Sequence, residues 1–126
     1  MVEVYRLDIP PCPKPRMTKA DRWLKRKSVL KFFAFRDAVK QDKSWKTFQL
    51  LDMDSFEIEF HVQMPQSWSK KKKAEMIGKP HQQRPDLDNY LKAWKDSVYE
   101  EDAIVWRVKA SKLWTEETGH IIINYL

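Results

Sequence analysis

Residues 56–64 read FEIEFHVQM, a stretch in which every even-numbered position is apolar and every odd-numbered position is polar or charged. An alternation with a period of two predicts a β-strand that buries one face and exposes the other. Pro65 follows directly and is expected to end the strand, because proline cannot donate a backbone hydrogen bond. The chain is therefore expected to contain a half-buried sheet around which the other elements pack.

A helical pattern begins at residue 86, where apolar residues recur at intervals of three and four. They share one face at about 100° per residue and are Leu87, Tyr90, Leu91, Trp94 and Val98. Another helix is predicted from about Thr18 to Gln41. Its apolar stripe is less regular and consists of Trp23, Val29, Leu30, Phe33 and Val39. Both helices thus have an apolar face that a sheet can bury.

Three further strands and a short helix are predicted. Residues 2–9 form a first or edge strand that ends at two prolines. Residues 103–114 alternate apolar and polar side chains and residues 120–125 follow after a turn, so we expect these two strands to form a hairpin. A short basic helix is expected over residues 67–77, ended by a glycine and a proline.

The order of these elements, β-α-β-(α)-α-β-β, predicts an α+β fold. We expect a single domain, residues 1–126, in which a mixed four-stranded β-sheet is packed by two main helices. The 126 residues, 42% of them hydrophobic, suffice for one domain with a core. Disorder is therefore excluded as the default state of the chain.

The chain has a single cysteine, Cys12, so no intrachain disulfide can form. Its cysteine and histidines do not cluster as they do in a structural zinc site. The first residues lack the apolar run of a signal peptide, and no stretch approaches the roughly 18 uncharged residues of a membrane span. We expect a soluble protein of the reducing cytoplasm, without membrane association.

Positive charge is concentrated in two segments of a chain whose formal net charge is +6. Residues 14–46 hold twelve Lys and Arg against three Asp and Glu, and residues 70–84 hold six against one. Two basic segments beside an acidic remainder are typical of a protein that binds a polyanion such as DNA. The alternative is that these segments are solvated surfaces. A membrane surface is less favoured, because the basic residues of the first segment surround its predicted helix.

Two aspartates stand at the start of the predicted helix, in the sequence RPDLDN. Side chains at i and i+2 diverge by about 200° in a regular helix, so Asp86 and Asp88 converge only if Asp86 precedes the first turn. The proline before Asp86 favours that extended conformation. In a purely structural interpretation Asp86 is an N-cap and Asp88 a first-turn acid. Lys92 and Asp96 then add exposed i,i+4 pairs.

A second acidic cluster, which ends at Asp102, favours a catalytic interpretation. If the strand that follows Asp102 pairs in the sheet on which the helix packs, its carboxylate can approach Asp86 and Asp88. Three hard oxygen ligands suit Mg²⁺ or Mn²⁺. Such an ion can polarise a phosphodiester and activate water, while Lys92 stabilises the developing negative charge. The residues thus indicate a metal-dependent nuclease, and a non-catalytic nucleic-acid-binding module is the alternative.

The run RPDLDNYLKAWKDSV, followed closely by EDAIVW, resembles the signature of RusA-type Holliday junction resolvases. The resemblance is close over residues 84–112 and elsewhere concerns the order of elements. It implies that Asp86, Asp88 and Asp102 are catalytic aspartates that bind Mg²⁺. It also implies that Lys92 is the catalytic lysine.

Two more residues, Asn89 and Asp96, fit the family pattern without an assigned role. The link between the helix and Asp102 is short, so Glu101 is the alternative third ligand. The arginine-rich run that can precede the family motif is reduced to HQQR, and we expect other basic residues to supply phosphate contacts. The candidates for DNA contact are Lys14, Arg16, Lys70, Lys71, Lys72, Lys73, Arg84 and Lys112.

Members of this family are small homodimeric endonucleases, often from phages or prophages, that nick opposing strands of a four-way junction in DNA recombination and repair. An isologous dimer suits such a substrate, because it offers two identical sites to two equivalent strands. The resemblance therefore implies a homodimeric, Mg²⁺- or Mn²⁺-dependent endodeoxyribonuclease that acts on junction DNA. Cleavage of other branched or single-stranded nucleic acid is the alternative.

Overall fold

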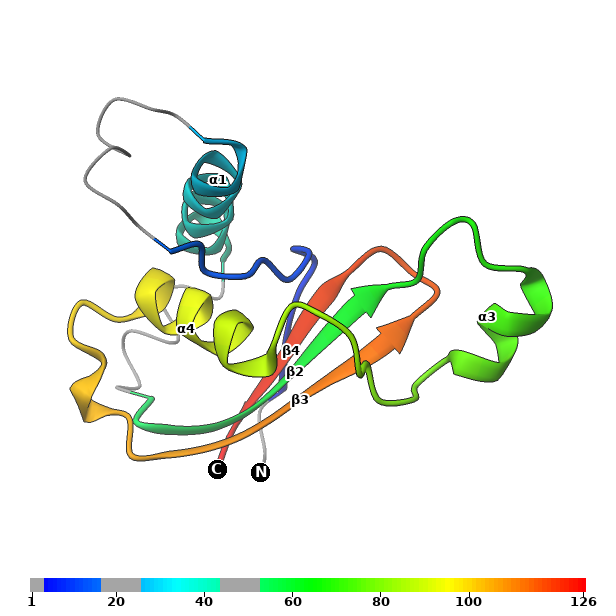
Figure 1. Ribbon diagram of the computed structural model, residues 1–126. Helices are drawn as coiled ribbons and strands as arrows, with labels where there is room; N and C mark the ends of the chain where they lie inside the picture. Colours follow the sequence, from blue (N-terminus) through cyan, green and yellow to red (C-terminus); the bar gives the residue numbers. More distant parts are fainter. Residues whose placement is uncertain (1–3, 17–25, 44–52) are drawn as a thin grey trace.

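The computed structural model describes residues 4–16, 26–43 and 53–126. In this part of the chain, two helices cover one face of a four-stranded sheet, and a short helix projects from the sheet's far end (Figure 1). One layer of helices on a mixed sheet is an α+β architecture. The predicted fold class is confirmed.

The central strand of the sheet is β2, Ser55–Gln63. It pairs in parallel with β3, Arg107–Thr115, and antiparallel with β4, His120–Tyr125. β4 in turn pairs antiparallel with β1, Val4–Leu7. The strand order is therefore β1-β4-β2-β3, with both parallel and antiparallel neighbours.

The alternation in β2 places its apolar residues toward the helices, as predicted. Phe56, Ile58 and Phe60 are at most 1% exposed. Ile123 and Ile121 of β4 lie opposite Ile58 and Phe60 and are fully buried. These side chains form the floor of the hydrophobic core.

The predicted hairpin is wrong, because β2 lies between β3 and β4. Alternation determines which face of a strand is buried but not which strand it pairs with. The turn after β3 ends at Gly119, where an added Cβ would come within 3.3 Å of the His61 carbonyl oxygen of β2. Glycine at this position thus permits the turn between β3 and β4 to pass close to the end of β2. The exposed Arg107 and Lys109 of β3 suit a strand at the sheet's edge.

β3 also begins four residues later than predicted. Residues Asp102–Ile104 form a 3₁₀ turn instead, and Ile104 and Trp106 are 46% and 69% exposed. Pairing with β2 begins only where Ser55 lies opposite Arg107, so the preceding residues lack a β2 partner within the described residues. Trp106 N–H donates to the Asp54 carbonyl oxygen at 3.0 Å just before that point.

α4, Leu87–Val98, has the predicted apolar face. Trp94 is fully buried, and Tyr90 and Val98 are nearly so. The Tyr90 ring stacks on Phe60 of β2 with a centroid distance of 5.4 Å. This packing fixes α4 on the sheet. Among the helices that the structure describes, none has the length and apolar character to cross a membrane.

α1, Lys27–Gln41, is shorter than the predicted helix. The backbone of Arg26 is extended (φ −61°, ψ 145°). The predicted continuous helix from Thr18 is therefore wrong, because Arg26 is not helical. Thr18 and Trp23 lie outside the described residues. Leu30 is 46% exposed, because the buried face is rotated away from it. That face consists of Val29, Phe32, Phe35 and Val39.

α3, Lys70–Met76, is the predicted short basic helix. The Ser69 hydroxyl accepts the Lys72 N–H at 3.1 Å and caps the helix. After the helix, Gly78 adopts a left-handed φ of +74°, and its N–H donates to the Trp114 carbonyl oxygen at 3.0 Å. His81 N–H donates similarly to the carbonyl oxygen of Lys112 at 2.9 Å. The segment after α3 is thereby attached to the outer edge of β3.

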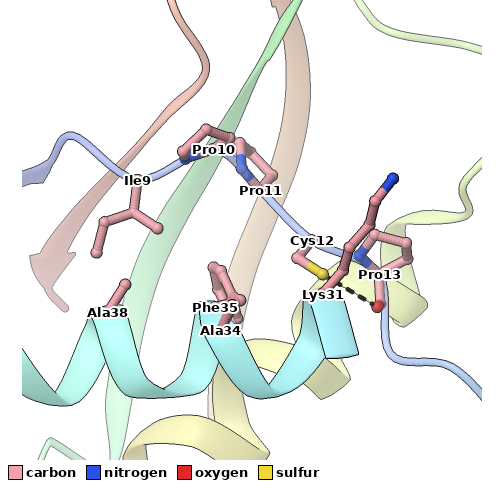
Figure 2. Close-up of a pocket in the computed structure, with 9 residues that line it drawn as sticks. All are labelled: Ile9, Pro10, Pro11, Cys12, Pro13, Lys31, Ala34, Phe35 and Ala38. Carbon is pink, nitrogen blue, oxygen red and sulfur yellow. Dashed lines mark hydrogen bonds between the residues drawn. The ribbon is translucent and has the colours of Figure 1, made fainter. Parts of the chain in front are cut away.

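The proline-rich segment after β1, residues 10–16, crosses α1 and encloses an apolar hollow (Figure 2). Cys12 is half-buried there, and its thiol donates to the Pro13 carbonyl oxygen at 3.5 Å. Burial raises the pKa of this thiol. Cys12 therefore packs as a small apolar residue. The hollow is lined by Ile9, Pro10, Pro11, Cys12, Pro13, Lys31, Ala34, Phe35 and Ala38.

Candidate active site

The start of α4 presents two exposed carboxylates. Asp86 is the N-cap residue, with the predicted extended backbone (φ −65°, ψ 151°), and Asp88 lies in the first turn. The Asp86 side chain accepts no capping hydrogen bond. Within the described part of the chain, neither carboxylate has an ion-pair or hydrogen-bond partner. Helix capping therefore does not account for Asp86, and both acids can accept an external cation.

Lys112 of β3 holds the loop that leads into α4. Its ammonium group donates to the carbonyl oxygens of Gln83 at 2.5 Å and Pro85 at 2.7 Å. These are charge-assisted hydrogen bonds to two backbone groups immediately before Asp86. Lys112 thus fixes the position of the acids relative to the sheet, and its contact with DNA stays a prediction.

Lys14 attaches the proline-rich segment to the same helix. Its backbone N–H donates to the Asn89 carbonyl oxygen at 3.0 Å, in the first turns of α4. Its ammonium lies 3.1 Å from Asp96 and 4.1 Å from the centroid of the Phe32 ring. Lys14 is therefore mostly enclosed by protein groups.

Lys92 lies one turn after Asp88 on α4 and is 59% exposed at its side chain. Its ammonium is 3.4 Å from Asp96 Oδ1, the i,i+4 pair that the sequence suggests. The side chain is accessible from solvent near the start of the helix. It can therefore meet an anionic ligand bound there.

Asp102 lies beside the later turns of α4 rather than at its start. Its Oδ2 is 3.7 Å from the ammonium of Lys95, which follows Asp88 by seven residues, or about 10 Å of helix rise. The neighbouring Glu101 carboxylate accepts the Ala103 N–H at 3.1 Å. Asp102 is thus paired with Lys95 of α4, the helix that begins at Asp86 and Asp88.

The predicted gathering of Asp86, Asp88 and Asp102 is not seen. Among the described residues, no three Asp, Glu, His or Cys side chains lie close enough to hold a metal ion together. Asp86 and Asp88 still have the donor chemistry that Mg²⁺ prefers, because this ion is commonly bound by one or two carboxylates together with substrate phosphates. The structure therefore leaves two exposed carboxylates at the start of α4, with Asp102 held by Lys95.

The basic candidates flank the start of α4. Arg84 and Asp86 line a hollow at this point together with Pro85 and Asn89. α3, which carries Lys70–Lys73, lies beyond the N-terminal end of α4 (Figure 1). Lys72 contacts the Trp68 ring at 4.2 Å from its centroid. Arg16 is exposed, and its carbonyl oxygen accepts a hydrogen bond from Arg26 at 2.7 Å.

His81 connects α3 to the loop before α4. The residue is 4% exposed, and its ring lies 4.3 Å from that of Trp114. Its Nδ1 has no hydrogen-bond partner within the described part of the chain. Burial lowers the pKa of His81, and the nearby Lys112 ammonium lowers it further. The buried imidazole therefore takes up a proton less readily than an exposed histidine.

Comparison with known protein families matches residues 8–124 to endodeoxyribonuclease RusA. The chain belongs to the RusA family. The match extends over the proline-rich segment, both acidic clusters, β2, β3 and β4 up to residue 124, and it begins directly after β1. A search of curated proteins gives no significant match. The residues at the start of α4 are therefore candidates for the active site of a RusA-family endodeoxyribonuclease.

Three contacts of this RusA-family site escaped prediction from the sequence. Lys112 and Lys14 were expected only to contact DNA, whereas each binds groups of α4 or its preceding loop. The third contact is the pairing of Lys95 with Asp102. Lys95 belongs to α4 and Asp102 to the 3₁₀ turn, so helix spacing alone does not indicate this pair.

We predict that Lys112→Met destabilises the protein, because both carbonyl groups lose a charged donor. The free energy of unfolding should fall by about 1–3 kcal/mol in urea titrations. Lys109→Met is the matched control on the same strand, with a side chain that is 78% exposed, and should change stability by less than about 0.5 kcal/mol. Equal stability of the two variants would show that Lys112 does not hold the loop.

His81 should titrate below its ordinary pKa of 6.5. The unfolded chain then binds a proton near pH 6.5 that the folded protein does not, so the free energy of unfolding should decrease as the pH falls through this value. NMR titration of the imidazole and urea titrations at several pH values measure both effects, and His81→Gln should weaken the pH dependence. A midpoint at or above 6.5 for His81 contradicts the prediction.

Proposed function

We propose that the protein is a Mg²⁺-dependent, structure-specific endonuclease that resolves Holliday (four-way) junctions. It would hydrolyse phosphodiester bonds in opposing strands during DNA recombination or repair. The observation that carries this proposal is the pair of exposed carboxylates at the start of α4, in a member of an endodeoxyribonuclease family. Asp86 occupies a capping position without using its side chain as a cap, which leaves it free for another role.

Asp86 and Asp88 would hold a Mg²⁺ or Mn²⁺ ion. When bound, this ion supplies Lewis acidity to the scissile phosphate and lowers the pKa of a coordinated water. Asp102 is the proposed third ligand and must exchange its contact with Lys95 for that role. Asp102 is favoured over Glu101, because the Glu101 carboxylate already accepts a backbone N–H of the 3₁₀ turn.

The basic side chains would bind the DNA backbone around these acids. Lys92 is exposed one turn from Asp88 and would contact the phosphate that is cleaved, where its charge stabilises the developing negative charge. Arg84, at the hollow beside Asp86, and the lysines of α3 would bind flanking phosphates. Lys14, Arg16 and Lys112 are further proposed contacts, although the ammonium groups of Lys14 and Lys112 are already engaged.

A homodimer would place two such sites against the two equivalent strands of a four-way junction. A cytoplasmic location is part of this proposal, because the half-buried Cys12 thiol and a DNA substrate both suit a reducing compartment.

The cleavage rates of junction, fork, duplex and single-stranded DNA, compared at one salt concentration, distinguish a resolvase from a nuclease with another substrate preference. A resolvase should cleave the junction fastest.

Asp88→Asn should still bind a synthetic four-way junction but lose nicking in Mg²⁺. We expect a decrease in single-turnover rate of about 10²–10³-fold, the usual cost of losing one electrostatic contact to the reacting group. Junction affinity should be equal or higher, because a negative charge beside the DNA is removed. Gel-based nicking and binding assays measure the two quantities.

Asp37→Asn is the matched control for Asp88→Asn. Asp37 lies on α1, is 59% exposed and pairs with the adjacent Arg36, so this variant loses the same charge on a different helix. Its nicking rate should equal that of the wild type. Retained nicking by Asp88→Asn would remove Asp88 from the mechanism, and absence of DNA cleavage by the wild type would favour a non-catalytic binding module.

A further inference from the structure

Asp96 contacts two lysines that come from different parts of the chain. Its Oδ1 lies 3.4 Å from the ammonium of Lys92 on the same helix. Its Oδ2 lies 3.1 Å from the ammonium of Lys14 in the proline-rich segment. One carboxylate therefore joins the proposed catalytic lysine to a segment that is more than seventy residues distant in sequence.

The contact with Lys14 is the more enclosed of the two. The side chains of Asp96 and Lys14 are 25% and 20% exposed, whereas that of Lys92 is 59% exposed. Lys14 is further fixed by the Phe32 ring and by its backbone hydrogen bond to Asn89. A partly buried ion pair is less screened by salt than a surface pair. Asp96 is thus held firmly on one side and offers its other oxygen to an exposed lysine.

Lys92 and Asp96 lie in a row with Asp88 along α4. Asp88, Lys92 and Asp96 follow each other at intervals of four residues and form one stripe on the helix surface. Lys92 lies between the two acids, and its ammonium contacts Asp96. Without that contact, a flexible lysine with four side-chain torsions would sample many positions around the stripe.

We infer that Asp96 is a positioning residue for Lys92. It holds the ammonium group on the stripe that begins at Asp88, and Lys14 holds Asp96 in turn. The inference rests on the proposed function, since it assigns Lys92 a phosphate to contact. An ordinary exposed i,i+4 pair would contribute only about 0.3–0.5 kcal/mol of stability and no catalytic effect. The enclosed Lys14 contact distinguishes Asp96 from such a pair.

A double-mutant cycle tests this inference, with single-turnover nicking at saturating protein and junction affinity as separate readouts. Asp96→Asn should lower the rate by about tenfold, as expected for a misplaced catalytic group, and leave junction affinity within about twofold. In the Lys92→Ala background, Asp96→Asn should have no further effect on the rate, because Asp96 acts through Lys92. Asp96→Glu keeps the charge and should restore part of the rate.

Asp37→Asn again serves as the control for lost charge on a helix surface, and thermal unfolding is measured for every variant. Should Asp96→Asn fail to fold, Asp96→Glu in both backgrounds provides the same cycle. The inference is overturned if Asp96→Asn nicks as fast as Asp37→Asn, or if it lowers the rate by the same factor with and without Lys92. A wild-type protein that cleaves no DNA contradicts the proposed function and, with it, this inference.

Discussion

One face of α4 is buried against β2, and this packing sets the position of the candidate site. Trp94 is fully buried and Tyr90 stacks on Phe60, so the rotation of α4 about its axis is fixed. Asp88 and Lys92 then face solvent, because they lie on the remaining surface of the helix. Lys112 fixes the helix start by binding two carbonyl groups of the preceding loop. Hydrophobic packing thereby determines where charged groups can act.

The elements that the sequence predicted well are those with regular periodicity. β2 and α4 follow their hydrophobic patterns almost residue by residue, since each packs one face against a single layer. Strand neighbours were not predictable in the same way. The β3–β4 turn resembles that of a hairpin, but a parallel pairing of β2 with β3 places β2 between the two strands. Pairing of this kind depends on the whole sheet rather than on the turn.

The candidate site was predictable in its residue types and local positions. Asp86 at the N-cap and Asp88 in the first turn follow from the proline and the helical pattern alone. The partners of the surrounding lysines were not predictable, because Lys14, Lys95 and Lys112 reach their carboxylate or carbonyl partners across tertiary contacts. Asp102 shows the same limit, since its approach to the other acids depended on a strand that begins later than the alternation indicated.

We propose that the carboxylates at the start of α4 bind a divalent cation when DNA is present. Mn²⁺ binding can be measured by EPR of the free ion in mixtures of protein and four-way junction, with the junction alone as the baseline. The wild-type protein should bind Mn²⁺ beyond that baseline, and a variant with Asp86→Asn and Asp88→Asn should not. Equal binding by the two proteins would exclude these carboxylates as ligands.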